Sequence, residues 1–440
     1  MDILIKIAQL FLCFTILVGI HELGHFLMAR AFKIRVEKFY IFFDPWFSLF
    51  KFKRGDTEYG LGWLPLGGYV KIAGMIDESM DKEQMKQPVK PDEFRAKPAW
   101  QRLLVMVAGV MMNVLLAIVI YCAVCYTWGD SYFSNQDAKW GYNFNPTAHE
   151  MGFRDGDRFV SIDGEEIDNV MLVQNDLLIT DGGRRVVVER GGEPVTLDIP
   201  FESLLRMRQE KAYEDLFTLR LPFIVDSVSY TSAVEAGLQS GDEVVAIDDL
   251  RDADYPRYRD YLQKHKNDKV LLTVRRDGAL IDSLALPVDA EGRIGVTVTN
   301  PYSLRTQYYT FWESIPAGIH KAGKTISSYW DPLKLIVQPK TKMYEELGGF
   351  VAIGSIFPGS WDWHDFWLKT AFLSIILAVM NLLPIPGLDG GHALFTLWEI
   401  ITRRKPSEKF LEVAQYVGLM IILALLVYAN GNDIYRFFIK

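Results

Sequence analysis

Two histidines and a glutamate near the start of the chain have the types and spacing that metal chemistry needs. They form the sequence His21-Glu22-Leu23-Gly24-His25. Histidines four residues apart on a helix project from one face, so His21 and His25 can bind one zinc ion. Glu22 then points to the open position of the metal, where it can act as a general base on water. The motif predicts a zinc site suited to hydrolysis.

This motif lies inside an apolar run, Ile7–Ala29, that is long enough to cross a membrane. As a helix, the run spans about 34 Å at 1.5 Å per residue, close to the thickness of a bilayer core. Ionisable groups at that depth cost roughly 2.5–3.5 kcal/mol each, so three of them within five residues need a compensating partner. A bound metal explains the motif better than chance does.

A catalytic zinc ion with two histidine ligands needs a third protein ligand. The candidates at membrane depth are Asp389 and His392, both in the sequence NLLPIPGLDGGH at 381–392. Pro384 and Pro386 interrupt a helix there, and broken backbone at that depth is tolerated only where it is buried in protein or lines a wet cavity. We expect Asp389 to be the ligand, because a carboxylate offsets the charge of zinc, and His392 to lie behind it or at the cytosolic edge. The alternative is that Asp389 caps the helix that follows.

The elements that must position these residues are membrane helices. Four blocks qualify as spans: Ile7–Ala29, Leu103–Tyr126, Trp367–Leu383 with a continuation to about Leu397, and Leu411–Ala429. Lysine and arginine cluster after the first span, before the second, and between the third and fourth. The positive-inside rule therefore predicts that these loops are cytosolic, and that both termini and the long insert at about 128–363 face the opposite side.

Charge and cysteine content exclude some alternatives. The net charge of −8 gives no reason to expect nucleic-acid binding. The three cysteines, Cys13, Cys122 and Cys125, all lie in predicted spans, so no disulfide framework is expected in the insert.

Between the first two spans, the glycine-rich and aromatic stretch Asp56–Gly74 predicts a β-hairpin around Pro65. Two interpretations are equally supported. The hairpin is either a cytosolic turn that packs on the helix ends, or a strand pair beside the active site whose edge pairs with an extended substrate.

The second predicted span contains Gly109 and Asn113, four residues apart, a spacing typical of close helix contacts. We expect Gly109 to serve helix packing. Asn113 is a candidate to donate or accept a hydrogen bond at a neighbouring span or at the metal site.

The insert contains an internal repeat with a constant offset of 85 residues. Gly152–Asp163 matches Gly237–Asp248, and each copy is followed by a β-rich stretch with a glycine turn. Both copies resemble PDZ domains of the bacterial envelope-protease type, which bind peptides by strand addition. We therefore expect two tandem PDZ-like α+β domains at 128–220 and 221–302; they either bind peptides or act only as steric filters. The segment 303–363 predicts amphipathic pieces that lie on the membrane surface.

A membrane-embedded H-E-x-x-H with a distant N-x-x-P-x-P-x-x-D-G resembles the site-2 protease family of intramembrane zinc metalloproteases. With two PDZ modules between the second and third spans, the resemblance covers essentially the whole chain, and is to the bacterial branch that regulates a stress-response sigma factor. It implies five regions: helices and hairpin at 1–127, the two PDZ-like domains, the interfacial segment 303–363, and the last two spans at 364–440. One departure is Gly349-Phe350-Val351, where relatives often have a Gly-Pro-Ile-type loop.

The resemblance also implies roles for single residues. His21, His25 and Asp389 would bind Zn²⁺, with Glu22 as the general base. Residues that would contact the substrate or open the third helix are Asn381, Pro384, Pro386, Gly67, Gly68 and Tyr69.

The implied function is cleavage of transmembrane protein substrates within the lipid bilayer of the bacterial inner membrane, with the PDZ domains periplasmic and the active site near the cytosolic side. Substrates would be an already trimmed anti-sigma factor, and also remnant signal peptides. The competing hypothesis is a non-catalytic membrane scaffold that binds exported peptides through its PDZ modules. A metal transporter is disfavoured because one ligand cluster is evident. The sequence does not indicate an oligomeric state.

Overall fold

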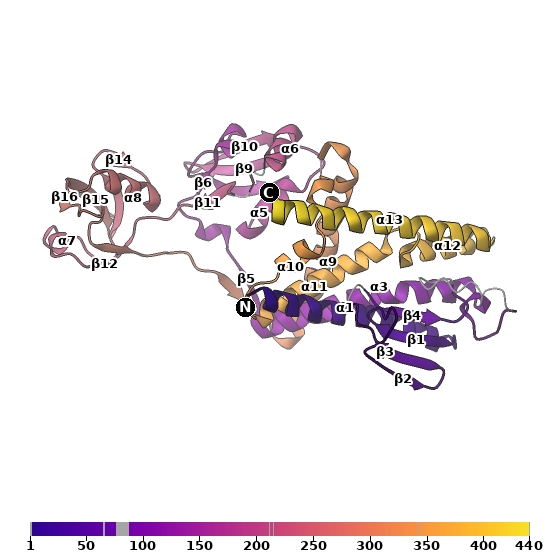
Figure 1. Ribbon diagram of the computed structural model, residues 1–440. Coiled ribbons are helices and arrows are strands. Elements are labelled where there is room, and N and C mark those ends of the chain that lie inside the picture. The colour runs from indigo at the N-terminus through magenta and orange to yellow at the C-terminus, as the bar shows by residue number, and fades with distance from the viewer. Residues whose placement is uncertain are drawn as a thin grey trace. The chain divides into compact units, whose positions relative to one another are not determined.

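The computed structural model describes residues 2–64, 67–75, 88–210, 212–213, 215–341 and 343–439. The chain divides into two compact units, residues 1–130 with 308–440 and residues 131–307. The first unit holds the membrane helices together with residues 308–363 of the predicted insert, and the second holds most of the rest of that insert (Figure 1).

Among the described residues, four helices are long and apolar enough to cross a membrane, in agreement with the prediction. They are α1 (Asp2–Ala31), α3 (Ala99–Trp128), α11 (Trp363–Leu382) and α13 (Glu408–Ile434). The apolar span at α13 covers Lys409–Phe437. Helical hydrogen bonds satisfy the backbone groups within the length of each helix, which a lipid environment requires, and the apolar side chains match the lipid. These findings fit an integral membrane protein.

Helix α3 is at the centre of this unit. It packs against α1, α11, α12 (Asp389–Thr402) and α9 (Phe311–Val337). Small residues allow the close approach: a Cβ at Gly24 of α1 would lie 2.5 Å from the Ala108 carbonyl oxygen of α3. The glycine inside the histidine motif therefore lets the two helices touch.

A four-stranded sheet follows α1, and it differs from the predicted hairpin. Its strands are β1 (Val36–Ile41), β2 (Phe50–Arg54), β3 (Thr57–Leu61) and β4 (Tyr69–Ile72), in the order β2-β3-β1-β4. The predicted partners β3 and β4 do not pair with each other, because β1 lies between them, parallel to β3 and antiparallel to β4. The hairpin is instead β2–β3, closed at Gly55, and Pro65 lies outside the described residues.

The sheet has two open edges among the described strands, β4 and β2. A buried cluster that includes Ala29, Val36 and Ile72 joins the end of α1 to the sheet. This cluster aligns β4 beside the histidine motif.

Between α9 and α11, the chain forms a short helix α10 (Phe350–Ser355). Helix α9 corresponds to the predicted amphipathic segment, and it exposes large side chains such as Phe311, Trp312 and Trp330. The predicted departure at Gly349-Phe350-Val351 forms the start of α10, where Asp433 of α13 accepts hydrogen bonds from the Val351 and Ala352 amides at 2.9 and 3.0 Å.

The second unit contains two copies of one strand pattern. The first copy has β7 (Arg158–Ile162), β8 (Glu165–Glu166), β9 (Arg184–Arg190) and β10 (Glu193–Ile199) in the order β10-β9-β7-β8. The second has β13 (Glu243–Ile247), β14 (Leu250–Arg251), β15 (Lys269–Arg276) and β16 (Ala279–Pro287) in the equivalent order β14-β13-β15-β16. Each copy has its own buried hydrophobic cluster.

Shorter elements complete each copy. In the first they are β6 (Tyr142–Phe144), α4 (Pro146–Glu150), α5 (Val170–Leu178), α6 (Phe201–Gln209) and β11 (Phe217–Leu219). In the second they are β12 (Val225–Val228), α7 (Thr231–Glu235), α8 (Tyr255–Lys264) and β17 (Val296–Val298). At the ends of the insert, β5 (Asp130–Tyr132) pairs with β18 (Arg305–Gln307).

The repeated Gly-x-x-x-Gly-Asp turn has a physical purpose in both copies. The buried carboxylate of Asp157 accepts two hydrogen bonds from Arg190, which also donates to the Gly152 carbonyl. Asp242 and Arg276 repeat this arrangement in the second copy. A charged bidentate pair thus fastens each turn to the last residue of β9 or β15, the strand that pairs with the one after the turn, which explains why the pattern recurs at the same spacing.

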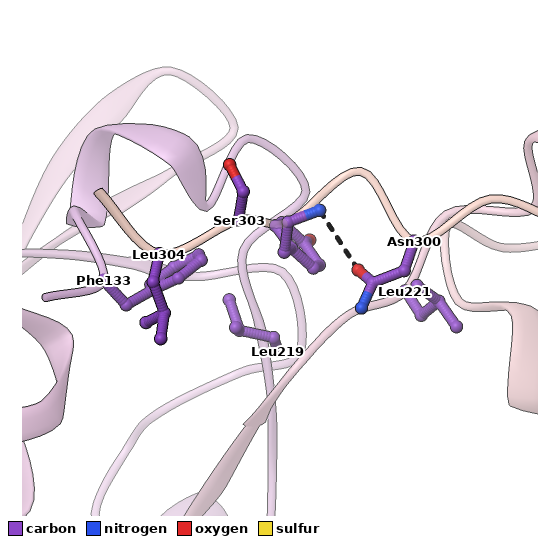
Figure 2. A pocket seen from close by; sticks show the side chains of 7 residues that line it. Phe133, Leu219, Leu221, Asn300, Ser303 and Leu304 are labelled. Carbon is purple, nitrogen blue, oxygen red and sulfur yellow. Dashed lines mark hydrogen bonds between the residues drawn. The ribbon is translucent and has the colours of Figure 1, made fainter. Parts of the chain in front are cut away.

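A cavity of about 390 Å³ in this unit is bordered by the segments before and after the second copy (Figure 2). Phe133, Leu219, Leu221, Ser303 and Leu304 border it, and the Asn300 side chain accepts a hydrogen bond from the Tyr302 amide at 3.0 Å. The candidate zinc ligands and general base, His21, His25, Asp389 and Glu22, do not line this cavity.

Candidate active site

His21, His25 and Asp389 come together although His21 and Asp389 are 368 positions apart in the sequence. Both histidines are buried on α1, and Asp389 is the first residue of α12. Asp389 Oδ2 lies 3.1 Å from His21 Nε2 and 3.2 Å from His25 Nε2, and the two Nε2 atoms are 3.2 Å apart. The three atoms form a nearly equilateral triangle.

Helix α3 closes the back of this triangle. His25 Nδ1 lies 2.8 Å from the Val105 carbonyl oxygen, so this nitrogen carries a proton and donates it. The lone pair of His25 Nε2 is therefore free and points to Asp389. A Cβ at Gly109 would lie 2.4 Å from His25 Nε2 and 2.7 Å from His21 Cε1. Gly109 thus makes room for both imidazoles, a role beyond the helix packing expected from its spacing.

Asn113 contacts the other histidine, His21. A hydrogen bond at the metal site was one of the two roles expected for Asn113. Its side chain is fully buried, and its amide nitrogen lies 3.4 Å from His21 Nδ1 while its amide oxygen has no described partner. The two ends of an amide are assigned from hydrogen bonds and are interchangeable in shape. Turning the amide over places the oxygen where it accepts the Nδ1 proton of His21, which leaves the lone pair of His21 Nε2 for a metal ion.

The triangle has the dimensions that a zinc ion requires. With zinc–ligand bonds of 2.0–2.1 Å and tetrahedral angles, neighbouring ligand atoms are about 3.3 Å apart. The three observed distances are 3.1 to 3.2 Å. Asp389 Oδ2 is buried and accepts no hydrogen bond from a described donor. The lone pairs of Asp389 Oδ2 and the two Nε2 atoms would repel one another, and a cation between the three atoms would stabilise them.

Asp389 does not cap α12, which was the alternative role expected for it. The residue in the capping position of α12 is Leu388, and no side chain caps the helix there. Helix α11 ends at Leu382, before Pro384 and Pro386, and the chain turns through Gly387 at a φ of 100°. This break brings the start of α12 to the depth of the histidines.

A cavity of about 880 Å³ opens in front of the triangle. Its lining comes from α1, the β4 edge, α11, the broken segment, α12 and α13, and it includes Glu22, Gly67, Gly68, Tyr69, Asn381, Asp389 and His392. The residues expected from the sequence are therefore gathered around one space, apart from Pro384 and Pro386, which break the helix behind it. The Asn381 amide nitrogen lies 3.4 Å from His21 Nε2.

Gly68 positions the edge strand against α1. A Cβ at this residue would lie 2.7 Å from both the Tyr40 carbonyl oxygen and Val18 Cγ1, and 3.2 Å from Glu22 Cγ. Only glycine allows the strand to pass this close to Glu22. Tyr69 is held beside it by a ring stack on Tyr40 and by a hydrogen bond from its hydroxyl to Asp44 Oδ1 at 2.9 Å.

Sequence reasoning missed two features of the site. The first is the Val105 carbonyl, a backbone group that any residue type supplies, so the sequence does not indicate it. Asp44 comes from the loop before β2, and its proximity to Tyr69 depends on the sheet order.

The fold and this site define a membrane-embedded zinc metalloprotease of the site-2 type. The model of peptidase family M50 matches residues 9–425, and the chain belongs to that family. Family membership supports zinc as the cofactor and favours an enzyme over a non-catalytic scaffold.

Relatives match over nearly their whole length. A candidate zinc metalloprotease of Clostridium perfringens is 29% identical over 427 residues, 96% of each chain. A candidate zinc metalloprotease of Vibrio cholerae is 29% identical over 462 residues, 99% of each chain. The protein named regulator of sigma E protease in Haemophilus influenzae is 27% identical over 460 residues, 99% of this chain and 100% of its own.

Proposed function

We propose that this zinc metalloprotease cuts peptide bonds within transmembrane segments, and that His21, His25 and Asp389 bind the zinc ion. The observation that carries the proposal is the triangle of ligand atoms with edges of 3.1 to 3.2 Å in a cavity between apolar helices. Zinc bound there supplies Lewis acidity, which polarises the scissile carbonyl and acidifies water.

Glu22 is the proposed general base. It follows His21 directly on α1 and lines the cavity, so its carboxylate faces the same space as the three ligand atoms without belonging to the triangle. A carboxylate in that place can accept a proton from the attacking water and later pass it to the leaving amine.

The β4 edge is the proposed substrate-binding strand. A helical substrate hides its carbonyls in internal hydrogen bonds, so it must unwind before it is cut, and lipid offers no replacement partners. Gly67, Gly68 and Tyr69 line the cavity, and β4 pairs only with β1 among the described strands. Its free edge can take up an extended segment by strand addition, and Asn381 can donate to the same segment.

The proposed substrates are membrane proteins that another protease has already trimmed. The name of the Haemophilus influenzae relative, regulator of sigma E protease, supports an anti-sigma factor of the sigma-E pathway as one substrate. Remnant signal peptides share the same chemistry, a single apolar segment with little attached to it. The two repeats of the insert, proposed to be PDZ domains at 128–220 and 221–302, would exclude bulky untrimmed substrates.

The proposed location is the bacterial inner membrane. Arg30 in the last turn of α1, Lys33 and Arg35 after it, and Arg403 and Arg404 after α12 support a cytosolic position for these loops and a periplasmic one for the insert. The site would then lie towards the cytosolic side.

The test uses purified protein in lipid nanodiscs with a synthetic transmembrane peptide that contains a helix-breaking residue. Mass spectrometry maps the products with and without a zinc chelator. We expect chelator-sensitive cuts inside the apolar segment, and no cuts with Glu22→Gln, whose zinc content should equal that of the wild type. Cuts that occur only outside the apolar segment, or persist in Glu22→Gln, would overturn the proposal.

A further inference from the structure

The edge strand at the other side of the sheet, β2, faces away from the catalytic cavity and carries two kinds of exposed side chain. Phe50 and Phe52 are 62% and 50% exposed, and Trp46 in the preceding loop is 91% exposed. Lys51, Lys53 and Arg54 are exposed as well, and the structure pairs none of them with an acidic side chain of the described residues. No role in peptide hydrolysis accounts for this surface.

The depth of β2 in the membrane follows from its contacts. Ala29, at the end of the apolar run of α1, packs with Val36 at the start of β1. Thr57 Oγ1 donates to the Val36 carbonyl at 2.8 Å, and Thr57 pairs with Arg54. Arg54 therefore lies level with Ala29, where the apolar core of a bilayer ends and the lipid headgroups begin.

The opposite end of the sheet reaches deep along α1. The ring centroids of Phe42, directly after β1, and Phe11 are 5.1 Å apart. Phe11 is about 27 Å from Ala29 along the helix at 1.5 Å per residue. On β2, Phe50 lies about 13 Å from Arg54 at roughly 3.3 Å per residue. The strand thus runs from headgroup level at Arg54 into the apolar core at Phe50, and along it Lys51 and Lys53 alternate with the two phenylalanines.

We propose that this surface binds an acidic phospholipid, with the acyl chains along Trp46, Phe50 and Phe52 and the phosphate at Lys53 and Arg54. Lys53 and Arg54 stand at the headgroup end of the strand and Phe50 at its apolar end, the order in which phosphate and acyl chains follow each other in a lipid molecule. The unpaired edge of β2 adds a reason: open strand edges are unfavourable against hydrocarbon, and phosphate oxygens can accept hydrogen bonds from its free amides. Lys51 reaches the same layer by extending its long side chain towards the interface.

The size of the effect follows from the charge. A lysine or arginine near an acidic membrane surface strengthens attraction by roughly fivefold, so three of them correspond to about a hundredfold. Because part of this attraction is not specific to one site, we expect a change of at least tenfold in the affinity for a single lipid.

The test measures stepwise binding of phosphatidylglycerol and of phosphatidylcholine to the full-length protein in detergent, by native mass spectrometry. The variant Lys51→Gln/Lys53→Gln/Arg54→Gln should raise the dissociation constant of the first phosphatidylglycerol at least tenfold and leave that of phosphatidylcholine unchanged. The control variant, Lys264→Gln/Lys266→Gln/Lys269→Gln, removes the same charge from the insert and should bind as the wild type does.

A second variant guards against misfolding. Lys51→Arg/Lys53→Arg keeps the charge and should keep the preference for phosphatidylglycerol. An unchanged dissociation constant in the charge-removing variant, or an equal loss of both lipids, would overturn the proposal. Displacement of phosphatidylglycerol by a soluble acidic peptide would also overturn it, because the surface would then be a site for protein.

Discussion

Replacing Gly109 with alanine tests how the two histidines are positioned. The added Cβ would lie 2.4 Å from His25 Nε2 and 2.7 Å from His21 Cε1, whereas ordinary contacts begin at about 3.4 Å. The His25 ring must therefore move by about 1 Å, and α3, packed on several helices, cannot move away easily. Alanine favours helix more than glycine does, so α3 itself should not be weakened.

The expected loss is large because metal sites tolerate errors of only about 0.2 Å in their distances. A displacement of 1 Å should weaken zinc binding by roughly ten- to a hundredfold, in line with changes to residues that orient metal ligands. Peptide cleavage should fall by about a hundredfold even at saturating zinc, since a misplacement of that size removes the aligned geometry.

The assay is competition of the purified Gly109→Ala protein with a chromophoric zinc chelator, followed by cleavage of the transmembrane peptide at saturating zinc. Gly323→Ala is a matched control, because this helical glycine of α9 has nothing within 4 Å of an added Cβ. It should match the wild type in both measurements. If Gly109→Ala also bound zinc with wild-type affinity, the proposed seating of the histidines against α3 would be wrong.

Three further predictions concern other residues. Asn113→Leu should weaken zinc binding about tenfold, whereas Asn113→Asp, which keeps an oxygen towards His21, should restore most of it; equal losses in the chelator assay would refute the orienting role. Gly68→Ala should raise KM for the transmembrane peptide with zinc content unchanged, because the β4 edge must shift; a wild-type KM would argue against strand addition there. Asp157→Ala should cost the first repeat about 3 kcal/mol, by leaving Arg190 without its partner, and should speed amide hydrogen exchange in β7 and β9 but not in β13 and β15; uniform exchange in both repeats would contradict this.

Much of the site could be predicted because its signals are local. The spacing of His21 and His25 fixes their common helix face, and the length of the apolar run places them in a membrane. The prolines at 384 and 386 announce a broken helix, and few carboxylates other than Asp389 occur near it. Each of these inferences needs only a short stretch of sequence.

The order of the β-sheet could not be predicted in the same way. Gly60, Gly62 and Gly67 suggest a local turn, but β1 inserts between β3 and β4 through a parallel pairing that depends on distant contacts. The glycines have another purpose: a Cβ at Gly60 would lie 2.2 Å from the Tyr40 ring. Glycine is required both in a tight turn and where two strands pack closely. The glycine pattern alone therefore does not distinguish a turn from close packing.

X-ray absorption at the zinc edge of the purified, zinc-loaded protein tests the central claim most directly. Two imidazoles and two oxygen ligands, one of them lost in Asp389→Ala, are the expected result, with bond lengths of about 2.0–2.1 Å. A third imidazole, as from His392, or a sulfur at about 2.3 Å would contradict the account, since the ligands would then not be the three atoms that the helices α1 and α12 bring together.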